Sequence, residues 1–184
     1  MSSMSNVSIR MLGVRLAVFD EFIASCGGEK ALHGKTTSEV NERYIMPQVA
    51  KVKTSYCDFL MTRNHWGVDI ATVYISHSWE SLFLDLVEAM KCYFSENPDV
   101  VVWIDMFSSN QFIRNNSQQD SDWVQWNITF KSAIEEFGHT VVVITSWDNP
   151  TPLRRTWCLF EIYCTIEMES KLEIAMTFRY DIHQ

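Results

Sequence analysis

Four short segments with the composition of strands, all of them after Ala71, alternate along the chain with segments of helical periodicity. They cover residues 72–76, 99–104, 140–145 and 171–176, and the second and third contain the apolar runs DVVVWI and TVVVIT. Strands that are apolar along their whole length are typical of parallel sheets, because helices cover both faces of such a sheet. The intervening segments have the length of helices and cover residues 79–94, 123–137 and 155–169. The alternation predicts βαβ units and an α/β fold with a parallel sheet.

The N-terminal part of the chain has a different pattern, which predicts helices. Apolar residues recur at three- and four-residue steps over residues 10–25 and again over residues 48–61. Between them, Thr36-x-x-Glu39 is a capping box that begins another helix. The predicted organisation is a helical N-terminal extension followed by an α/β domain, residues 1–70 and 71–184.

Charge and cysteine usage exclude several classes of protein. Fifteen Lys and Arg against 23 Asp and Glu give a net charge of −8, with no basic run that could hold a nucleic-acid backbone. No apolar run approaches the ~20 residues that span a bilayer. The five cysteines are scattered without a CxxC pair, which favours a reducing compartment, and we expect a cytoplasmic protein. The five histidines contain no HxxxH pair, so no metal site is expected.

The predicted sheet indicates where a ligand would bind. In open α/β sheets, ligands bind beyond the carboxyl ends of the strands, at the point where the strand order reverses. For an order of 2-1-3-4, this point lies between the first and third strands. The loops that face it are residues 76–79, with the sequence Ser-His-Ser-Trp, and residues 146–156.

Several common site motifs are absent from these loops. No glycine follows the first strand, so neither GxGxxG nor GxxxxGK[ST] is present to hold a phosphate. A GxSxG nucleophile elbow is also absent, which excludes the common serine hydrolase layout. A phosphorylation site of the receiver type needs several acids at the strand ends. Asp105 is the one acid that the sequence places there, so such a site is not favoured.

Trp157 and Glu161, at the start of the last predicted helix, remain as candidates. They are four residues apart and therefore lie one turn apart on the same face. A carboxylate beside an aromatic ring suits the cleavage of an N-glycosidic bond, because the carboxylate stabilises an oxocarbenium-like transition state. When the leaving group is already cationic, as the nicotinamide of NAD+ is, no general acid is required. The alternative is a surface glutamate beside a core tryptophan.

Three segments, in the correct order, resemble the TIR (Toll/interleukin-1 receptor) domain family. TVYISHSW at residues 72–79 is similar to the family's first strand, and VWID at residues 102–105 is similar to its second strand, which the BB loop follows. Residues 132–166 resemble the run that ends in the helix with the Trp-Cys-x-x-Glu box, here Trp157 to Glu161. The resemblance covers about residues 70–176 and is nearest to divergent TIR-like modules with an SHxW motif.

This resemblance implies a flavodoxin-like three-layer fold with a parallel sheet of order 2-1-3-4. In the enzymatic members the glutamate of the box is catalytic, which makes Glu161 the expected catalytic residue, and Trp157 resembles the aromatic residue of the pocket. The other implied substrate contacts match the first loop and the BB loop, and they are Ser76, His77, Ser78, Trp79, Asp105 and Phe112. The implied substrate is NAD+, with no metal and no further cofactor.

The family leaves more than one function open. Some members hydrolyse or cyclise NAD+ in signalling, immune or cell-death responses, and self-assembly activates them. Others are non-catalytic adaptors that recruit further TIR domains, and a module that binds NAD+ without cleaving it is a third alternative. The implied partners are therefore NAD+ and either copies of this chain or other TIR domains.

Alternatives also stay open for individual residues and for one edge of the sheet. Cys158 as a nucleophile with His77 as its base is less favoured, because a helical cysteine in an apolar setting is more often buried and inert. Trp123 and Trp126 have helical spacing that suits packing or an assembly surface. The family's fifth strand has no counterpart, so either the N-terminal extension takes that edge or the sequence is a fragment.

Overall fold

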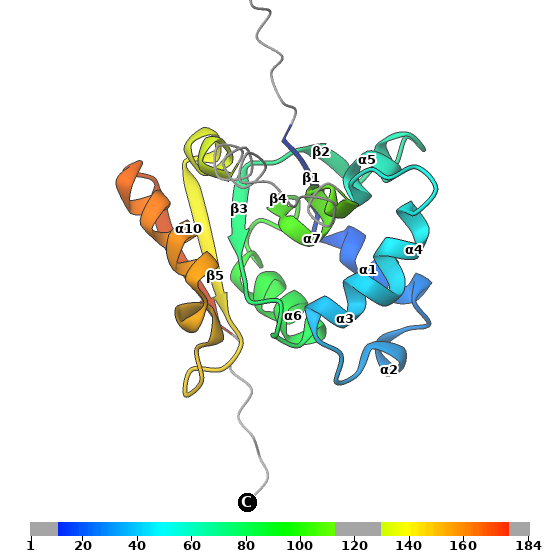
Figure 1. Ribbon diagram of the computed structural model, residues 1–184, viewed down its shortest axis with the longest axis horizontal. Coiled ribbons are helices and arrows are strands. Elements are labelled where there is room, and N and C mark those ends of the chain that lie inside the picture. Colours follow the sequence, from blue (N-terminus) through cyan, green and yellow to red (C-terminus); the bar gives the residue numbers. More distant parts are fainter. Residues whose placement is uncertain (1–10, 113–129, 177–184) are drawn as a thin grey trace, which may run out of the picture.

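The computed structural model describes residues 11–112 and 130–176, which form a mixed sheet with helices on both faces (Figure 1). The order of its six strands is β2-β1-β4-β3-β5-β6. Their bounds are β1 Leu12–Arg15, β2 Val68–Ile70, β3 Val73–Ser76, β4 Val101–Ile104, β5 His139–Ile144 and β6 Lys171–Met176. β3 pairs in parallel with β4 and β5, and β5 pairs in parallel with β6. β1 pairs antiparallel with both β2 and β4.

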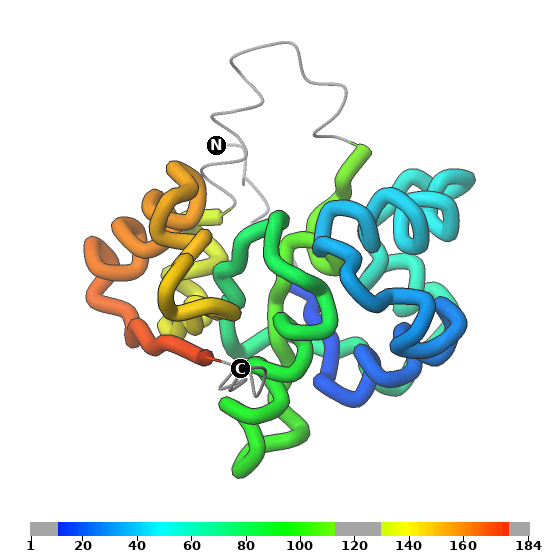
Figure 2. The backbone as a smooth tube through the Cα atoms, turned by 90° about the horizontal axis from the view of Figure 1, so that it is seen from below, coloured from blue at the N-terminus to red at the C-terminus, as the bar shows by residue number. Residues whose placement is uncertain are grey.

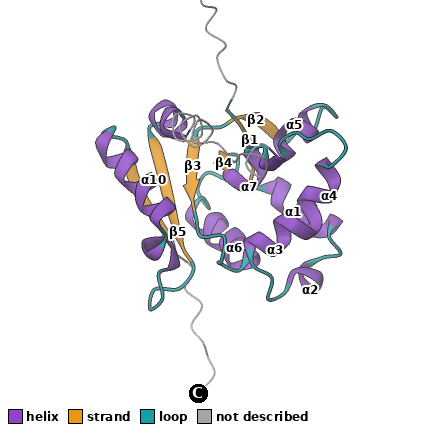
Figure 3. Ribbon diagram, viewed as in Figure 1, coloured by secondary structure: helices purple, strands orange, loops and turns teal. Residues whose placement is uncertain are grey.

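The helices fall into an N-terminal group and a group that connects the parallel strands (Figure 3). The N-terminal group is α1 Ala17–Ser25, α2 Glu29–Leu32, α3 Thr37–Val40, the π-helix Asn41–Ile45, α4 Met46–Val49 and α5 Tyr56–Met61. The second group is α6 Phe83–Tyr93, α7 Asp105–Ser108, the 3₁₀-helix Thr151–Arg154 and α10 Thr156–Glu167. Residues 130–137 are also helical. No helix among the described residues combines the length and the apolar character needed to cross a membrane.

The four segments predicted as strands are β3, β4, β5 and β6, which confirms a mixed fold of helices and a sheet. Every residue of β3 and β4 is buried, as the apolar character of these segments predicts. The prediction of a parallel sheet with the order 2-1-3-4 was wrong for the sheet as a whole. Two further strands, β1 and β2, make the sheet mixed and give it a different order.

The start of the predicted helix over residues 10–25 is instead the strand β1, and the helix begins at Ala17. Gly13 permits this, because a Cβ at this position would lie 2.3 Å from the carbonyl oxygen of Val102 in β4. Val14, next to it, is fully buried in the core. Pairing on both sides of β1 outweighs the local helical pattern, as tertiary contacts commonly do. β1 and β2 lie beyond β4, at the opposite end from β6, so the N-terminal extension does not take the edge beyond the last predicted strand.

The predicted capping box is confirmed, whereas the third predicted helix is interrupted. The side chain of Thr36 accepts a hydrogen bond from the backbone N–H of Glu39, and the Glu39 carboxylate accepts one from the backbone N–H of Thr36. The helix predicted over residues 48–61 was wrong in its first half, because α4 ends at Val49 and α5 begins only after Ser55. The Ser55 hydroxyl accepts from the backbone N–H of Asp58 and so begins a new helix.

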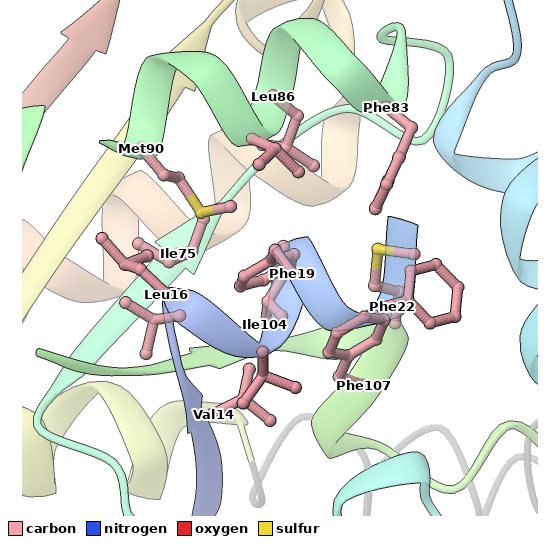
Figure 4. Close-up of a cluster of buried hydrophobic side chains, with 14 of the residues drawn as sticks. Val14, Leu16, Phe19, Phe22, Ile75, Phe83, Leu86, Met90, Ile104 and Phe107 are labelled. Carbon is pink, nitrogen blue, oxygen red and sulfur yellow. The ribbon is translucent and has the colours of Figure 1, made fainter. Parts of the chain in front are cut away.

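Alternate residues of the strands pack into two separate cores. Val73 and Ile75 of β3 face the core that contains α1, α6 and α7. Figure 4 shows Ile75 of β3 in this core beside Leu16 and beside Met90 of α6, with Phe19 of α1 and Leu86 of α6 drawn in the same cluster. Tyr74, between those two residues of β3, faces the other core, which contains side chains of residues 130–134 and of α10. Figure 2 shows the N-terminal helices on one side of the central strands and α10 on the other.

We expect Gly13→Ala to destabilise the fold by roughly 2 kcal/mol or more, because the new Cβ forces the backbones of β1 and β4 apart. The measurement is urea unfolding. Asp69→Ala is the matched control, since Asp69 lies opposite Gly13 in β2 and loses an exposed ion pair with Arg15 worth at most about 1 kcal/mol. Equal stability of the two variants would contradict the close approach of β1 to β4.

Candidate functional site

The Glu161 carboxylate lies in the second turn of α10, against the carboxyl end of the central strand β3. Successive residues of a strand point to opposite faces, so Tyr74 and Ser76 point to the same face, toward α10. The Tyr74 hydroxyl donates to Glu161 Oε1 at 2.7 Å, and the Ser76 hydroxyl donates to Glu161 Oε2 at 2.5 Å. Each carboxylate oxygen therefore has its own hydroxyl donor.

Burial dominates the electrostatics of this carboxylate. Glu161 is 3% exposed, and burial raises its pKa to about 8, although the hydroxyls of Ser76 and Tyr74 favour the ionised form and lower it. The charge of Asp105 raises the pKa of Glu161 further. Burial also raises the pKa of Tyr74 well above its usual range, so the phenol remains a donor. At neutral pH the protonated form of Glu161 predominates.

Contacts along α10 fix the position of this glutamate. One turn further on, the hydroxyl of Thr165 donates to the Glu161 carbonyl at 2.8 Å and forms a second hydrogen bond with the Thr140 hydroxyl of β5 at 2.9 Å. Both threonines are fully buried, so this bond joins the helix to the sheet. At the start of the helix, the Arg155 guanidinium bonds the carboxylate of Glu80, which follows the loop after β3. Arg155 therefore serves as a link between the two loops that the sequence placed at the site.

A second polar cluster lies at the carboxyl ends of β3 and β4 and contains three of the predicted substrate contacts, His77, Trp79 and Asp105. The indole N–H of Trp79 donates to Asp105 Oδ2 at 2.6 Å. His77 Nδ1 is 3.7 Å from Asp105 Oδ1, which is longer than a hydrogen bond and within the range of an ion pair. Burial lowers the pKa of His77, and the charge of Asp105 opposes this effect. The imidazole is therefore neutral at pH 7.

Cys158 does not have the surroundings of a nucleophile. Its thiol donates to the backbone carbonyl of His77 at 3.4 Å and not to a ring nitrogen. Burial raises the pKa of Cys158 to about 12, so the reactive thiolate is not formed at neutral pH. The thiol joins α10 to the loop after β3, as a small buried residue would.

Trp157 lies beside Glu161 at the edge of the second core. Its ring packs edge-on against Phe130 at a centroid distance of 4.8 Å and against Phe160 at 5.6 Å. Its side chain also hydrogen-bonds Glu161, which lowers the pKa of that carboxyl. Trp157 is half-buried.

The other predicted contacts are not part of these clusters. Ser78 is buried in the turn after β3, where its hydroxyl accepts from the backbone N–H of Glu80. Phe112 packs against the core of α1 and α6, and not against the core that contains Trp157. Trp123 and Trp126 lie outside the described residues.

Two residues of the site were missed in the sequence. Tyr74 lies two positions before Ser76, and the alternation of a strand was the signal that both face α10. Gln111 is buried, and its side-chain amide donates to the backbone carbonyl of Asp105 at 2.8 Å. A polar residue inside a predicted polar loop carries no sign that it is buried, so nothing in the sequence distinguished Gln111 from its neighbours.

The arrangement suits a hydroxyl-bearing ligand better than a metal. In residues 11–112 and 130–176, no group of three His, Cys, Asp or Glu side chains could hold a metal ion. Two open pockets lie around α1, α2 and α6, and neither is lined by Glu161, His77 or Asp105. A carboxylate that accepts one hydroxyl on each oxygen has the hydrogen-bonding pattern that the two hydroxyls of a ribose would offer.

Comparisons with known proteins do not connect this site to a characterised one. A scan against protein-family models found no match. Searches of the curated proteins and of the solved structures also found no significant match to this chain.

Proposed function

We propose that the chain is an NAD+ glycohydrolase of the TIR type, with or without cyclase activity, and that Glu161 is its catalytic carboxylate. The observation that carries the proposal is the pair of hydroxyl bonds from Tyr74 and Ser76 to the two oxygens of Glu161, at the carboxyl end of the central strand. Under this proposal the parallel part of the sheet and the helices on its faces correspond to the flavodoxin-like TIR fold. NAD+ is the substrate, and no metal takes part.

The chemistry follows from the charge of the substrate. The bond between the nicotinamide nitrogen and the ribose breaks with its electron pair on the nitrogen, so that the nicotinamide leaves neutral and positive charge develops on the ribose. A carboxylate in a low-dielectric site stabilises this charge strongly. The ribose hydroxyls replace those of Tyr74 and Ser76, and the positive charge of the substrate favours ionisation of Glu161.

The deciding experiment is the incubation of concentrated, pure protein with NAD+, with free nicotinamide as the readout. Release of nicotinamide that rises more than linearly with protein concentration supports a hydrolase that self-assembly activates. Binding of NAD+ without release supports a nucleotide sensor instead. If the protein neither binds NAD+ nor releases nicotinamide from it, the proposed hydrolase activity is contradicted.

Tyr74→Phe is expected to move the pH profile of NAD+ cleavage to higher pH. Activity needs the ionised carboxylate, so in the native chain it should rise with pH through about 8. Removing the Tyr74 hydroxyl removes a donor that favours the ionised form, so the pKa of Glu161 rises further. The measurement is kcat/KM against pH.

The matched control for this shift is Tyr163→Phe, on the same helix as Glu161. Tyr163 is exposed, and its hydroxyl donates to Glu167 at 3.2 Å and not to the site. Its variant should keep the native pH profile. A Tyr74→Phe profile that coincides with the native one would show that Glu161 does not control the rate.

A non-catalytic adaptor is the second candidate, because α10 exposes an apolar stripe. Leu159, Tyr163 and Ile166 recur at four- and three-residue steps on this helix and are 47%, 58% and 62% exposed. Exposed apolar side chains at this spacing suit contact with another copy of the chain. An assembly that grows with protein concentration, without release of nicotinamide from NAD+, would favour this function over the enzyme.

A further inference from the structure

The buried pair of His77 and Asp105 takes no part in breaking the glycosidic bond. It lies at the carboxyl ends of β3 and β4, and His77 directly follows Ser76, whose hydroxyl bonds the carboxylate of Glu161. The side chains of His77 and Asp105 are 2% and 9% exposed. Within the described part of the chain, neither His77 Nε2 nor Asp105 Oδ1 has a hydrogen-bond partner. Buried polar atoms without a partner are uncommon and call for a functional explanation.

The surrounding contacts hold Asp105 with one oxygen toward the imidazole. The Trp79 indole N–H donates to Asp105 Oδ2 at 2.6 Å, so the other oxygen of Asp105, Oδ1, faces His77 Nδ1. The rings of His77 and Trp79 are nearly parallel, with a centroid distance of 6.4 Å. Gln111 holds the backbone carbonyl of Asp105 from the other side. The pair is therefore fixed by three elements, the loop after β3, α7 and the residues that follow α7.

This orientation determines which nitrogen can accept a proton. A carboxylate next to Nδ1 favours the tautomer with the proton on Nδ1, so the lone pair is on Nε2. The lowered pKa of His77 keeps this lone pair free at pH 7. After a proton reaches Nε2, the nearby carboxylate of Asp105 stabilises the imidazolium.

We propose that His77 accepts the proton of the water that attacks the ribosyl group and that Asp105 is its positioning residue; this inference rests on the proposed NAD+ hydrolysis. The water oxygen forms the new bond to the anomeric carbon, and one water proton passes to Nε2. His77 then returns this proton to solvent, and the products are ADP-ribose and neutral nicotinamide. The adjacent residue Ser76 binds Glu161, so one loop would carry both the proton acceptor and a partner of the acid.

The test compares two nucleophiles for the same ribosyl group. Water must lose a proton when it attacks, whereas pyridine and azide carry no proton and need no base. In His77→Gln we expect the rate of hydrolysis to fall at least about tenfold, because general base catalysis contributes a factor of about 100 or more. The rate of exchange of nicotinamide for pyridine or azide should be retained. Asp105→Asn should shift the ratio of hydrolysis to exchange in the same direction, by a smaller factor.

The ratio is measured within one sample, so a variant that is partly unfolded lowers both rates and leaves the ratio unchanged. His139→Gln is the matched control, because His139 bonds Glu173 at the opposite end of the parallel strands and should keep the native ratio. Native hydrolysis in His77→Gln, or a parallel loss of hydrolysis and exchange, would overturn the role of His77 and leave the hydrolase standing. Absence of nicotinamide release from the native chain would overturn both.

Discussion

Replacing Glu161 by glutamine is expected to lower the rate of nicotinamide release from NAD+ by about 100- to 1000-fold without loss of folded protein. The amide cannot carry the negative charge that stabilises the ribosyl cation. It has the same shape as the protonated acid, which is the form that predominates at neutral pH because the pKa of Glu161 is about 8. The hydrogen bonds with Tyr74 and Ser76 can therefore be kept. The measurement is nicotinamide release at equal concentrations of folded protein.

Glu167→Gln is the matched control for this loss. Glu167 lies at the end of the same helix, is exposed, and bonds Lys131. Its variant makes the same substitution on the same helix, away from the bonds of Tyr74 and Ser76, and should cleave NAD+ at the native rate. A buried carboxylate with both oxygens bonded also fits a purely structural role, and that role would be indicated if Glu161→Gln cleaved NAD+ as fast as the native chain.

The parallel strands could be read from the sequence because their signal is local. Residues 72–76 are rich in strand-forming residues and residues 140–145 are mostly apolar, and the structure has β3 and β5 at these positions, buried as expected. β1 could not be read in this way. The spacing of Leu12, Leu16 and Phe19 fits a helix, and the preference for a strand comes from pairing with Val102, which is far away along the chain.

The candidate site was predicted in part for a similar reason. Loops at the carboxyl ends of neighbouring strands must meet, which brings His77 close to Asp105 and Ser76 close to Glu161. This rule does not predict which group bonds each oxygen of the Glu161 carboxylate. The bond from Tyr74 depends on the depth at which α10 crosses β3, and that depth is set by packing such as the Thr165–Thr140 contact. Phe112 was assigned by a loose match to a loop, without a packing argument, and it lies against the other core.

The stability of the native chain relative to Glu161→Gln is expected to fall as the pH rises from about 4.5 to about 8 and then to level off. The folded pKa of Glu161 is raised from 4.5 to about 8, so in this range the folded chain retains a proton that the unfolded chain has released. Stability decreases with pH wherever the folded state binds more protons, by about 1.4 kcal/mol for each unit of pKa difference. Glutamine does not titrate, and the contributions of all other titratable groups are the same in both proteins. The difference between their free energies of unfolding should therefore change by several kcal/mol.

The free energy of unfolding of both proteins, measured in urea at pH 5 and at pH 8, checks this prediction. It concerns the buried carboxyl alone and holds whether or not the chain cleaves NAD+. A pH-independent difference would mean that Glu161 is ionised at its ordinary pKa, in contact with water. The low exposure of Glu161 and the bonds from Tyr74 and Ser76 would then not describe its surroundings in solution, and the basis for the catalytic proposal would be removed. A fall in the difference toward pH 8, with nicotinamide release rising over the same range, would show that one carboxyl controls both stability and chemistry, because the ionisation that weakens the fold is the one that the reaction needs.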